Sequence, residues 1–176
     1  MSEKNVCRRI WNRLFHSLAR TLPGATSLRL FLHRLRGVKI GSDVFIGEDV
    51  YLENEYPEAI EIGDGVQISL RAVLIAHTRG PGKIVIGKNA YIGPSVMLIS
   101  SSGRTLKIGE GAVVGAGVVV SNDIADHMFV PSPQAKAVAR ATIPLATAEK
   151  IEDFIRGLVP VGRAGSDQQS EALSKR

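Results

Sequence analysis

The feature that most constrains this 176-residue chain is a six-residue repeat between Ile40 and Ala125. Each repeat begins with an aliphatic residue, often followed by glycine, and most carry a small or β-branched apolar residue four positions later. Because alternate residues of a strand point to opposite sides, positions one and five of a repeat face the same side. A six-residue period predicts a β-helix, in which three short strands form each triangular coil. The repeats begin at Ile40, Ile46, Leu52, Ile62, Ile68, Leu74, Ile86, Ile92, Leu98, Ile108, Val114 and Val120.

The predicted coils differ in length. The extra residues follow the third repeat of the first three coils, so loops are expected to leave one corner of the β-helix in successive coils. Loops that leave one side of a repeat protein usually form its binding face. The coils have 22, 24, 22 and 18 residues and span 40–61, 62–85, 86–107 and 108–125.

Two segments at the end of the repeats resemble the hexapeptide-repeat acyltransferases: V-V-G-A-G-V-V-V-S-N-D-I at 113–124 and V-P-S-P-Q-A-K-A-V-A-R at 130–140. The resemblance covers about 38–140. It implies an all-β solenoid, a left-handed parallel β-helix of about four coils, and a homotrimer with active sites between subunits. In the family, the second segment usually reads Gly-x-Pro-Ala-Lys. This chain departs from that pattern at Ser132 and Gln134.

The chain divides into four predicted parts. Residues 1–37 form a basic helical arm that caps the β-helix, and residues 38–140 form the repeat domain. Residues 141–160 contain a short helix, and residues 161–176, rich in Gly, Ser, Gln and charge, are expected to be a disordered tail.

The arm permits two interpretations. Residues 1–39 contain nine Lys or Arg and one acid, Glu3, and apolar residues recur at helical spacing in a first helix that ends near Pro23 and a second over 29–36. The apolar stripe could cover the open end of the β-helix and leave the arginines solvated, since a solenoid requires terminal caps. Alternatively, the arm could dock on an anionic membrane. Nucleic-acid binding is not expected, because the arm contains no reader motif.

His77 is the predicted catalytic residue. His16 and His33 belong to the arm and His127 follows the last coil, so His77 alone lies in a loop of the predicted corner. The resemblance places a general base at this kind of corner. A neutral imidazole is suited to accept a proton from an attacking hydroxyl or amine.

Coil arithmetic suggests neighbours for His77. Counting three residues past the first residue of each third repeat places Glu55, His77 and Ser101 at equivalent positions. Because adjacent strands lie about 4.8 Å apart, Glu55 is predicted to orient the imidazole. Asn54, Glu53 and Ser101 are candidate acceptor-binding residues; ordinary turn chemistry is the alternative explanation for the acidic loop.

The donor site rests on the resemblance, which implies acetyl-CoA in a groove between subunits. The matching positions are Pro94 and Ala116 for the pantetheine arm, and Ser121, Asn122 and Lys136 nearer the nucleotide, with Arg140 as a further phosphate partner. No metal is expected.

The predicted function is transfer of an acetyl group from acetyl-CoA to a hydroxyl of a sugar or glycan precursor. The alternatives are an amino-sugar or small-molecule N- or O-acetyltransferase and a non-catalytic β-helix that serves in assembly. A zinc enzyme of the γ-carbonic anhydrase type is disfavoured, because it needs three histidines around the metal. The single cysteine, Cys7, fits a reducing cytoplasm, and the basic arm suggests the inner face of the membrane.

Overall fold

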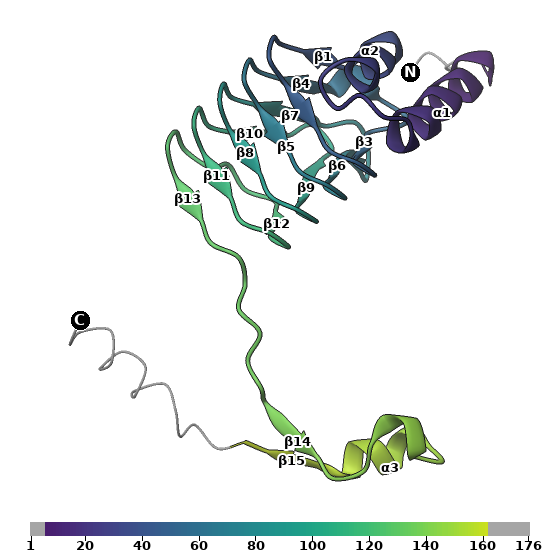
Figure 1. Cartoon of the computed structure of the whole chain (residues 1–176), viewed down its shortest axis with the longest axis vertical. Helices are drawn as coiled ribbons and strands as arrows, with labels where there is room; N and C mark the ends of the chain where they lie inside the picture. Colours follow the sequence, from purple (N-terminus) through teal and green to yellow (C-terminus); the bar gives the residue numbers. More distant parts are fainter. Residues whose placement is uncertain (1–5, 162–176) are drawn as a thin grey trace. The chain divides into compact units, whose positions relative to one another are not determined.

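The computed structural model describes residues 6–161, which form two compact units that divide between Pro133 and Gln134. The first unit contains two helices and a parallel β-solenoid (Figure 1). The second unit is small and is described by itself below. The fold class predicted from the repeats is confirmed.

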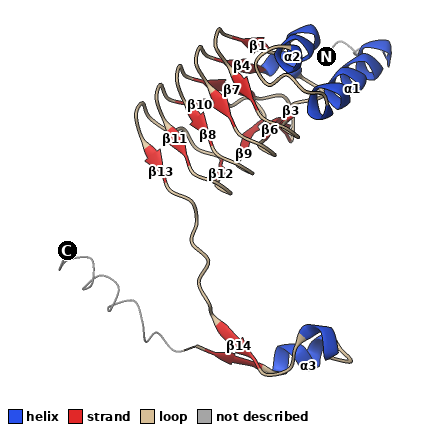
Figure 2. Cartoon of the chain, in the orientation of Figure 1, coloured by secondary structure: helices blue, strands red, loops and turns tan. Residues whose placement is uncertain are grey.

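Three parallel sheets form the faces of the solenoid, and each coil contributes one strand to each sheet (Figure 2). Sheet A consists of β1 (Lys39–Ile40), β4 (Ile60–Ile62), β7 (Lys83–Ile86) and β10 (Thr105–Ile108). Sheet B consists of β2 (Phe45–Ile46), β5 (Gln67–Ile68), β8 (Tyr91–Ile92), β11 (Val113–Val114) and β13 (Phe129–Val130). Sheet C consists of β3 (Tyr51–Leu52), β6 (Val73–Thr78), β9 (Met97–Ser101) and β12 (Val119–Val120).

The strand register confirms the first three coil lengths and corrects the fourth. In sheet C, Tyr51 pairs with Val73, 22 residues later, and Val73 pairs with Met97, 24 residues later. The last coil has 16 residues rather than the predicted 18, because Val113 pairs with Phe129. The chain turns from sheet C back toward sheet A within four residues of Val120, where Ile124 bridges to Ile108.

The core of the solenoid is the column of repeat positions that the sequence predicts. The first residues of the repeats from Ile46 to Val120 are buried, and so are most of the small residues four positions later. Burying such apolar side chains contributes about 1.5–3 kcal/mol each for the larger ones. The buried small residues are Val44, Val50, Val66, Ala72, Ala90, Val96 and Ala112.

Helices α1 (Val6–Thr21) and α2 (Leu28–Arg36) lie at the N-terminal end of the solenoid (Figure 1) and agree with the predicted pair. Gly37, with φ of 105°, ends α2 in the left-handed conformation. Three arginines of α2 cap the backbone carbonyls of the first coil. Arg34 donates to Ile40 and Gly41, Arg29 to Ile46, and Arg36 to Leu52 and Glu53.

The cap therefore differs from the predicted one. Arg29 and Arg36 are buried rather than solvated, and α2 contributes Leu30 to the core. The buried residues of α1 are Asn12, His16 and Ala19, whereas its larger apolar side chains are exposed, apart from the half-buried Phe15. Open strand edges require hydrogen-bond donors, and guanidinium groups supply them here better than an apolar stripe could.

The second unit contains an antiparallel pair, β14 (Ala139–Ala141) and β15 (Leu158–Pro160), with a 3₁₀ turn at Leu145–Thr147 and the short helix α3 (Ile151–Arg156) between them. The solenoid thus ends earlier than the predicted boundary at 140, with β13 as its last strand. The predicted tail, 161–176, lies outside the described residues apart from Val161. Within residues 6–161, no helix is both long enough and apolar enough to span a membrane.

Candidate active site

His77 lies near the end of β6, where this strand extends past the first-coil strand β3 into a tight loop. The ladder between β6 and β9 has an irregularity between Ile75 and Thr78. The Gly82 N–H donates to the Ala76 carbonyl at 2.6 Å, which closes the loop beneath His77. Gly82 is required there, because a Cβ at this position would lie 2.4 Å from the Ser101 carbonyl oxygen.

The carboxylate of Glu53 holds the imidazole. Glu53 Oε2 lies 2.6 Å from His77 Nδ1 and accepts the Ala76 N–H at 2.8 Å. Its Oε1 accepts the N–H groups of Glu55 at 2.8 Å and Tyr56 at 3.3 Å. The Glu53 side chain is fully buried, whereas that of His77 is 38% exposed. Four donors therefore fix a buried carboxylate that orients a partly exposed histidine.

This arrangement sets the ionisation of Glu53 and the tautomer of His77. Burial of Glu53 acts to raise its pKa, but the hydrogen bonds from His77, Ala76 and Glu55 together outweigh burial and lower the pKa. An ionised carboxylate only accepts hydrogen bonds, so Nδ1 carries the proton. In the neutral imidazole with this tautomer, Nε2 has the free lone pair, and none of the residues 6–161 is hydrogen-bonded to it. His77 is thus equipped as a proton acceptor.

A cavity of about 650 Å³ opens beside His77 on the outer side of sheet C. Arg71 and Arg79 line it, and neither guanidinium forms an ion pair within the part of the chain that the structure describes. Its cationic rim suits a ligand with negative charge. The other lining residues are Arg20, Asp49, Tyr51, Val73, Ile75 and Thr78.

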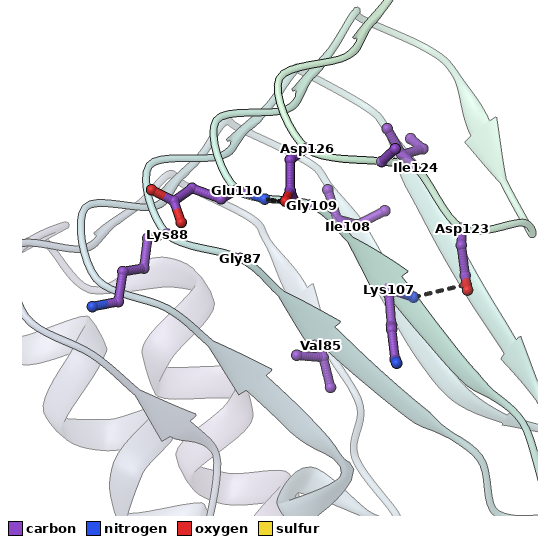
Figure 3. A pocket seen from close by; sticks show the side chains of 11 residues that line it. Val85, Gly87, Lys88, Lys107, Ile108, Gly109, Glu110, Asp123, Ile124 and Asp126 are labelled. Atoms are coloured by element: carbon purple, nitrogen blue, oxygen red, sulfur yellow. Dashed lines mark hydrogen bonds between the residues drawn. The ribbon is translucent and has the colours of Figure 1, made fainter.

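A second hollow, of about 640 Å³, lies on sheet A at the end of the solenoid (Figure 3). Its carboxylates accept backbone N–H groups: Asp123 from Lys107, and Asp126 from Glu110. These hydrogen bonds stabilise the turns of the last coil. No histidine lines this hollow, so His77 marks the better candidate for chemistry.

The predicted contact between Glu55 and His77 is wrong. Glu55 forms ion pairs with Arg9 and Arg13 of α1, at 3.3 and 3.5 Å. The prediction from residue counting assumed that β3 and β6 stay in register past the corner. However, β3 ends at Leu52, whereas β6 continues to Thr78. The chain therefore turns at Glu53, and this residue rather than Glu55 stays beside the imidazole.

The three candidate acceptor residues have different surroundings. Glu53 is buried and orients His77, so it does not line an acceptor site. Asn54 contacts the cap, because its side-chain oxygen accepts from Arg36 at 3.3 Å. Ser101 is the ladder partner of Thr78 rather than of His77, and it is exposed beside the His77 loop.

The candidate donor residues fall in two units. Pro94 and Ala116 lie at the same corner in successive coils, and the Pro94 carbonyl accepts the Gly117 N–H at 2.9 Å. Ser121 and Asn122 are exposed after β12, where the Asn122 side chain accepts from Arg104 at 3.1 Å. Lys136 and Arg140 belong to the second unit; their role stays a prediction.

Sequence reasoning did not find the cavity arginines or the support from the cap. Arg71 lies within the second repeat of its coil, and Arg79 follows His77 by two residues, so both could have been noticed as basic residues near the candidate corner. Arg36 could not, because its contact with the Glu53 carbonyl joins segments 17 residues apart through a helix packing that the repeat does not specify.

No protein-family model matches the sequence. Over 98 residues, 53% of this chain, it is 31% identical to the presumed acetyltransferase YvoF of Bacillus subtilis, and it spans about half (55%) of that relative's length. It is also 31% identical to the carboxysome assembly protein CcmN of Synechococcus elongatus over 137 residues, which cover 78% of this chain and 74% of CcmN.

Among solved structures, a galactoside acetyltransferase in complex with coenzyme A superposes with a TM-score of 0.51 at 21% sequence identity, over 75% of this chain and 80% of that one. This likeness shows the fold. The six-residue repeat and the relatives found by sequence lead to one assignment. The chain belongs to the hexapeptide-repeat acyltransferase family, whose members fold as left-handed parallel β-helices.

Proposed function

We propose that the protein transfers an acetyl group from acetyl-CoA to a hydroxyl of a sugar or glycan precursor, with His77 as the general base. One observation carries this proposal: a buried Glu53 carboxylate fixes Nδ1 of His77 at 2.6 Å, and the imidazole borders a cavity of about 650 Å³. A neutral imidazole oriented by a carboxylate is the arrangement that general-base catalysis requires.

The reaction needs no covalent enzyme intermediate. Nε2 of His77 takes the proton of the acceptor hydroxyl. At the same time the hydroxyl oxygen attacks the thioester carbonyl carbon and forms the new C–O bond. Collapse of the tetrahedral intermediate breaks the C–S bond, and the coenzyme leaves as a thiolate. The imidazolium then returns the proton to the sulfur, which leaves His77 neutral. Such a base contributes about 10²–10⁴ to the rate.

Two further observations support the substrates. The galactoside acetyltransferase that shares the fold was solved with coenzyme A, which supports acetyl-CoA as the donor. Arg71 and Arg79 in the His77 cavity favour a ligand that carries phosphate or another negative charge. Pro94, Ala116, Ser121, Asn122, Lys136 and Arg140 remain the proposed donor contacts.

A homotrimer with active sites between subunits is part of the proposal. The outward residues of sheet C at the cavity include Tyr51, Val73 and Ile75, which are apolar or aromatic and only half-buried. A neighbouring copy that covers this side would complete the wall of the cavity. Sedimentation equilibrium tests it: a trimer supports the proposal, and a monomer at working concentration contradicts it.

The experiment measures thiol release from acetyl-CoA by wild type and His77→Ala, screened against sugars, amino sugars and amines. We expect acceptor-dependent release that falls about 10²–10⁴-fold in the variant, with coenzyme binding retained. His127→Asn is a matched control, since His127 is exposed and does not line the cavity. Release that is equal in wild type and His77→Ala would contradict the role of His77.

The same screen separates the alternatives. Release that depends on amines or amino sugars would indicate an N-acetyltransferase instead of an O-acetyltransferase. A second candidate function is a non-catalytic role in assembly, which the similarity to the carboxysome assembly protein supports. Absence of both coenzyme binding and thiol release would favour that candidate.

A further inference from the structure

Helix α1 is docked on the solenoid by its polar side. Its buried residues are Asn12, His16 and Ala19, and Asn12 donates to the Asn54 carbonyl at 3.5 Å. An amphipathic helix of a globular domain normally turns its apolar stripe toward the core, whereas here the stripe is exposed. We call it the outer face of α1, and it comprises Val6, Ile10, Trp11, Leu14 and Leu18.

The outer face has the composition of an interfacial helix. Its residues recur at spacings of three and four along α1, and the indole of Trp11 lies against the ring of Phe15 with ring centroids 4.3 Å apart and planes tilted by 55°. Helix α2 adds exposed Leu28, Phe31 and Leu35 to the same cap. Exposed apolar stripes beside polar residues mark protein or membrane contacts rather than ordinary surface.

The charges around this face are positive. Arg8, Arg9 and Arg13 of α1 have side chains that are more than half exposed. Among residues 6–161, they form ion pairs with only two carboxylates, Glu55 and Glu58. Arg29 and Arg36 beneath them bind backbone carbonyls rather than carboxylates. The cap therefore carries an excess of positive charge, in line with the balance of +8 over residues 1–39.

We propose that the outer face of α1 lies on an anionic lipid surface. Apolar side chains would enter the boundary between headgroups and acyl chains, while each arginine near the surface contributes about 1 kcal/mol. A second copy of this chain is a poorer occupant, because pairing two such faces would bring two positive caps together. The negative charge of lipid headgroups complements the cap instead.

The position of α1 links this surface to the His77 site. Arg9 and Arg13 pair with Glu55, two residues from Glu53, and Arg20 of the same helix lines the His77 cavity. Docking of α1 would place the cavity close to the headgroups at the inner face of the membrane. An acceptor sugar carried on a lipid would fit this placement. The choice of such an acceptor rests on the proposed function, whereas the docking of α1 on the membrane does not depend on it.

The test uses the full chain and vesicles of phosphatidylcholine, with or without phosphatidylglycerol. Trp11 is the single tryptophan of the chain, so its fluorescence reports directly on the outer face. We expect co-sedimentation and a blue shift of the emission with the anionic vesicles, both weakened by salt. Leu14→Asp should reduce vesicle binding at least tenfold.

Ile155→Asp is the matched control, because Ile155 is 57% exposed in the second unit and Leu14 is 53% exposed. It should bind vesicles like wild type. Circular dichroism of both variants checks that the fold is intact. The proposal is overturned if wild type does not bind anionic vesicles, if Leu14→Asp binds them unchanged, or if Leu14→Asp instead abolishes a self-association of wild type. None of these readouts depends on acetyl transfer, so failure of one proposal is distinguishable from failure of the other.

Discussion

Three of the four histidines of this protein lie in two neighbouring regions with opposite surroundings. At the corner of sheet C, His77 is partly exposed and Nδ1 lies against the buried carboxylate of Glu53. Beneath the helical cap, His16 and His33 are buried, and Nδ1 of His33 lies 3.0 Å from the guanidinium of Arg36. Burial, followed by the charge of Arg36, lowers the pKa of each of these two histidines to about 3.

This comparison shows that burial by itself does not make a histidine functional. A carboxylate stabilises an imidazolium, whereas a guanidinium opposes it. His77 can therefore accept a proton during a reaction, while His16 and His33 stay neutral as packing groups of the cap. Arg36 joins the regions, since it contacts His33 and also donates to the backbone carbonyl of Glu53 at 2.6 Å.

The largest effect is expected from Glu53→Gln, which removes the negative charge from the corner. The amide cannot accept from all four donors, so the orientation and tautomer of His77 are lost, and thiol release should fall about 10²-fold or more. KM for acetyl-CoA should change little. Glu55→Gln is the matched control and should keep its rate of thiol release. An equal fall in thiol release in Glu55→Gln would contradict the assignment of Glu53, rather than Glu55, as the residue that orients His77.

A smaller effect is expected from Arg36→Met, which acts on both regions. The carbonyls of Leu52 and Glu53 would lose a buried donor, and we expect the free energy of unfolding in urea to fall by about 2–3 kcal/mol. Arg34→Met removes donors from more exposed carbonyls and should cost less than about 1 kcal/mol. An equal decrease in the free energy of unfolding in both variants would contradict the prediction that the buried contacts of Arg36 stabilise the fold more than the exposed contacts of Arg34.

A third test is the pH dependence of the free energy of unfolding that His16 and His33 produce. Their pKa values are about 3 when folded and 6.5 in the reference state, so the unfolded chain binds more protons and stability falls as pH drops from 6.5 toward 3. The slope is at most about 1.4 kcal/mol per pH unit for each histidine. Glu53, whose pKa is lowered from 4.5, contributes stability that is lost only below that value.

Urea unfolding between pH 6.5 and 5 therefore isolates the two histidines. His16→Leu should flatten the slope, whereas His127→Asn, at an exposed position with a φ of 58° that Asn tolerates, should leave it unchanged. A slope that persists undiminished in His16→Leu would show that His16 is not the group responsible.

The repeat predicted the fold closely because each of its positions makes contacts of one kind. Ile68, Ile92 and Val114 stack on one another in sheet B as the period requires. The prediction failed where the repeat ends: at the last coil, where the turn after Val120 is short, and at the corner loop, where β3 and β6 have different lengths. At the candidate site, the sequence singled out His77 by its place in the long loop, and its catalytic role stays a prediction. The predicted contact with Glu55 is wrong by two residues, since Glu53 contacts the imidazole.

The sequence by itself determined the solenoid, its three faces, the coil lengths up to the last, the two capping helices and the corner that carries His77. These follow from periodic burial and from local signals such as the glycine that ends α2. Only the tertiary structure decided that Glu53 holds His77, that α2 caps the open strands with arginines, and that α1 keeps its apolar stripe outside. These features depend on contacts between segments far apart in the chain, where alternation within a strand or helix carries no information about which side chain reaches which atom.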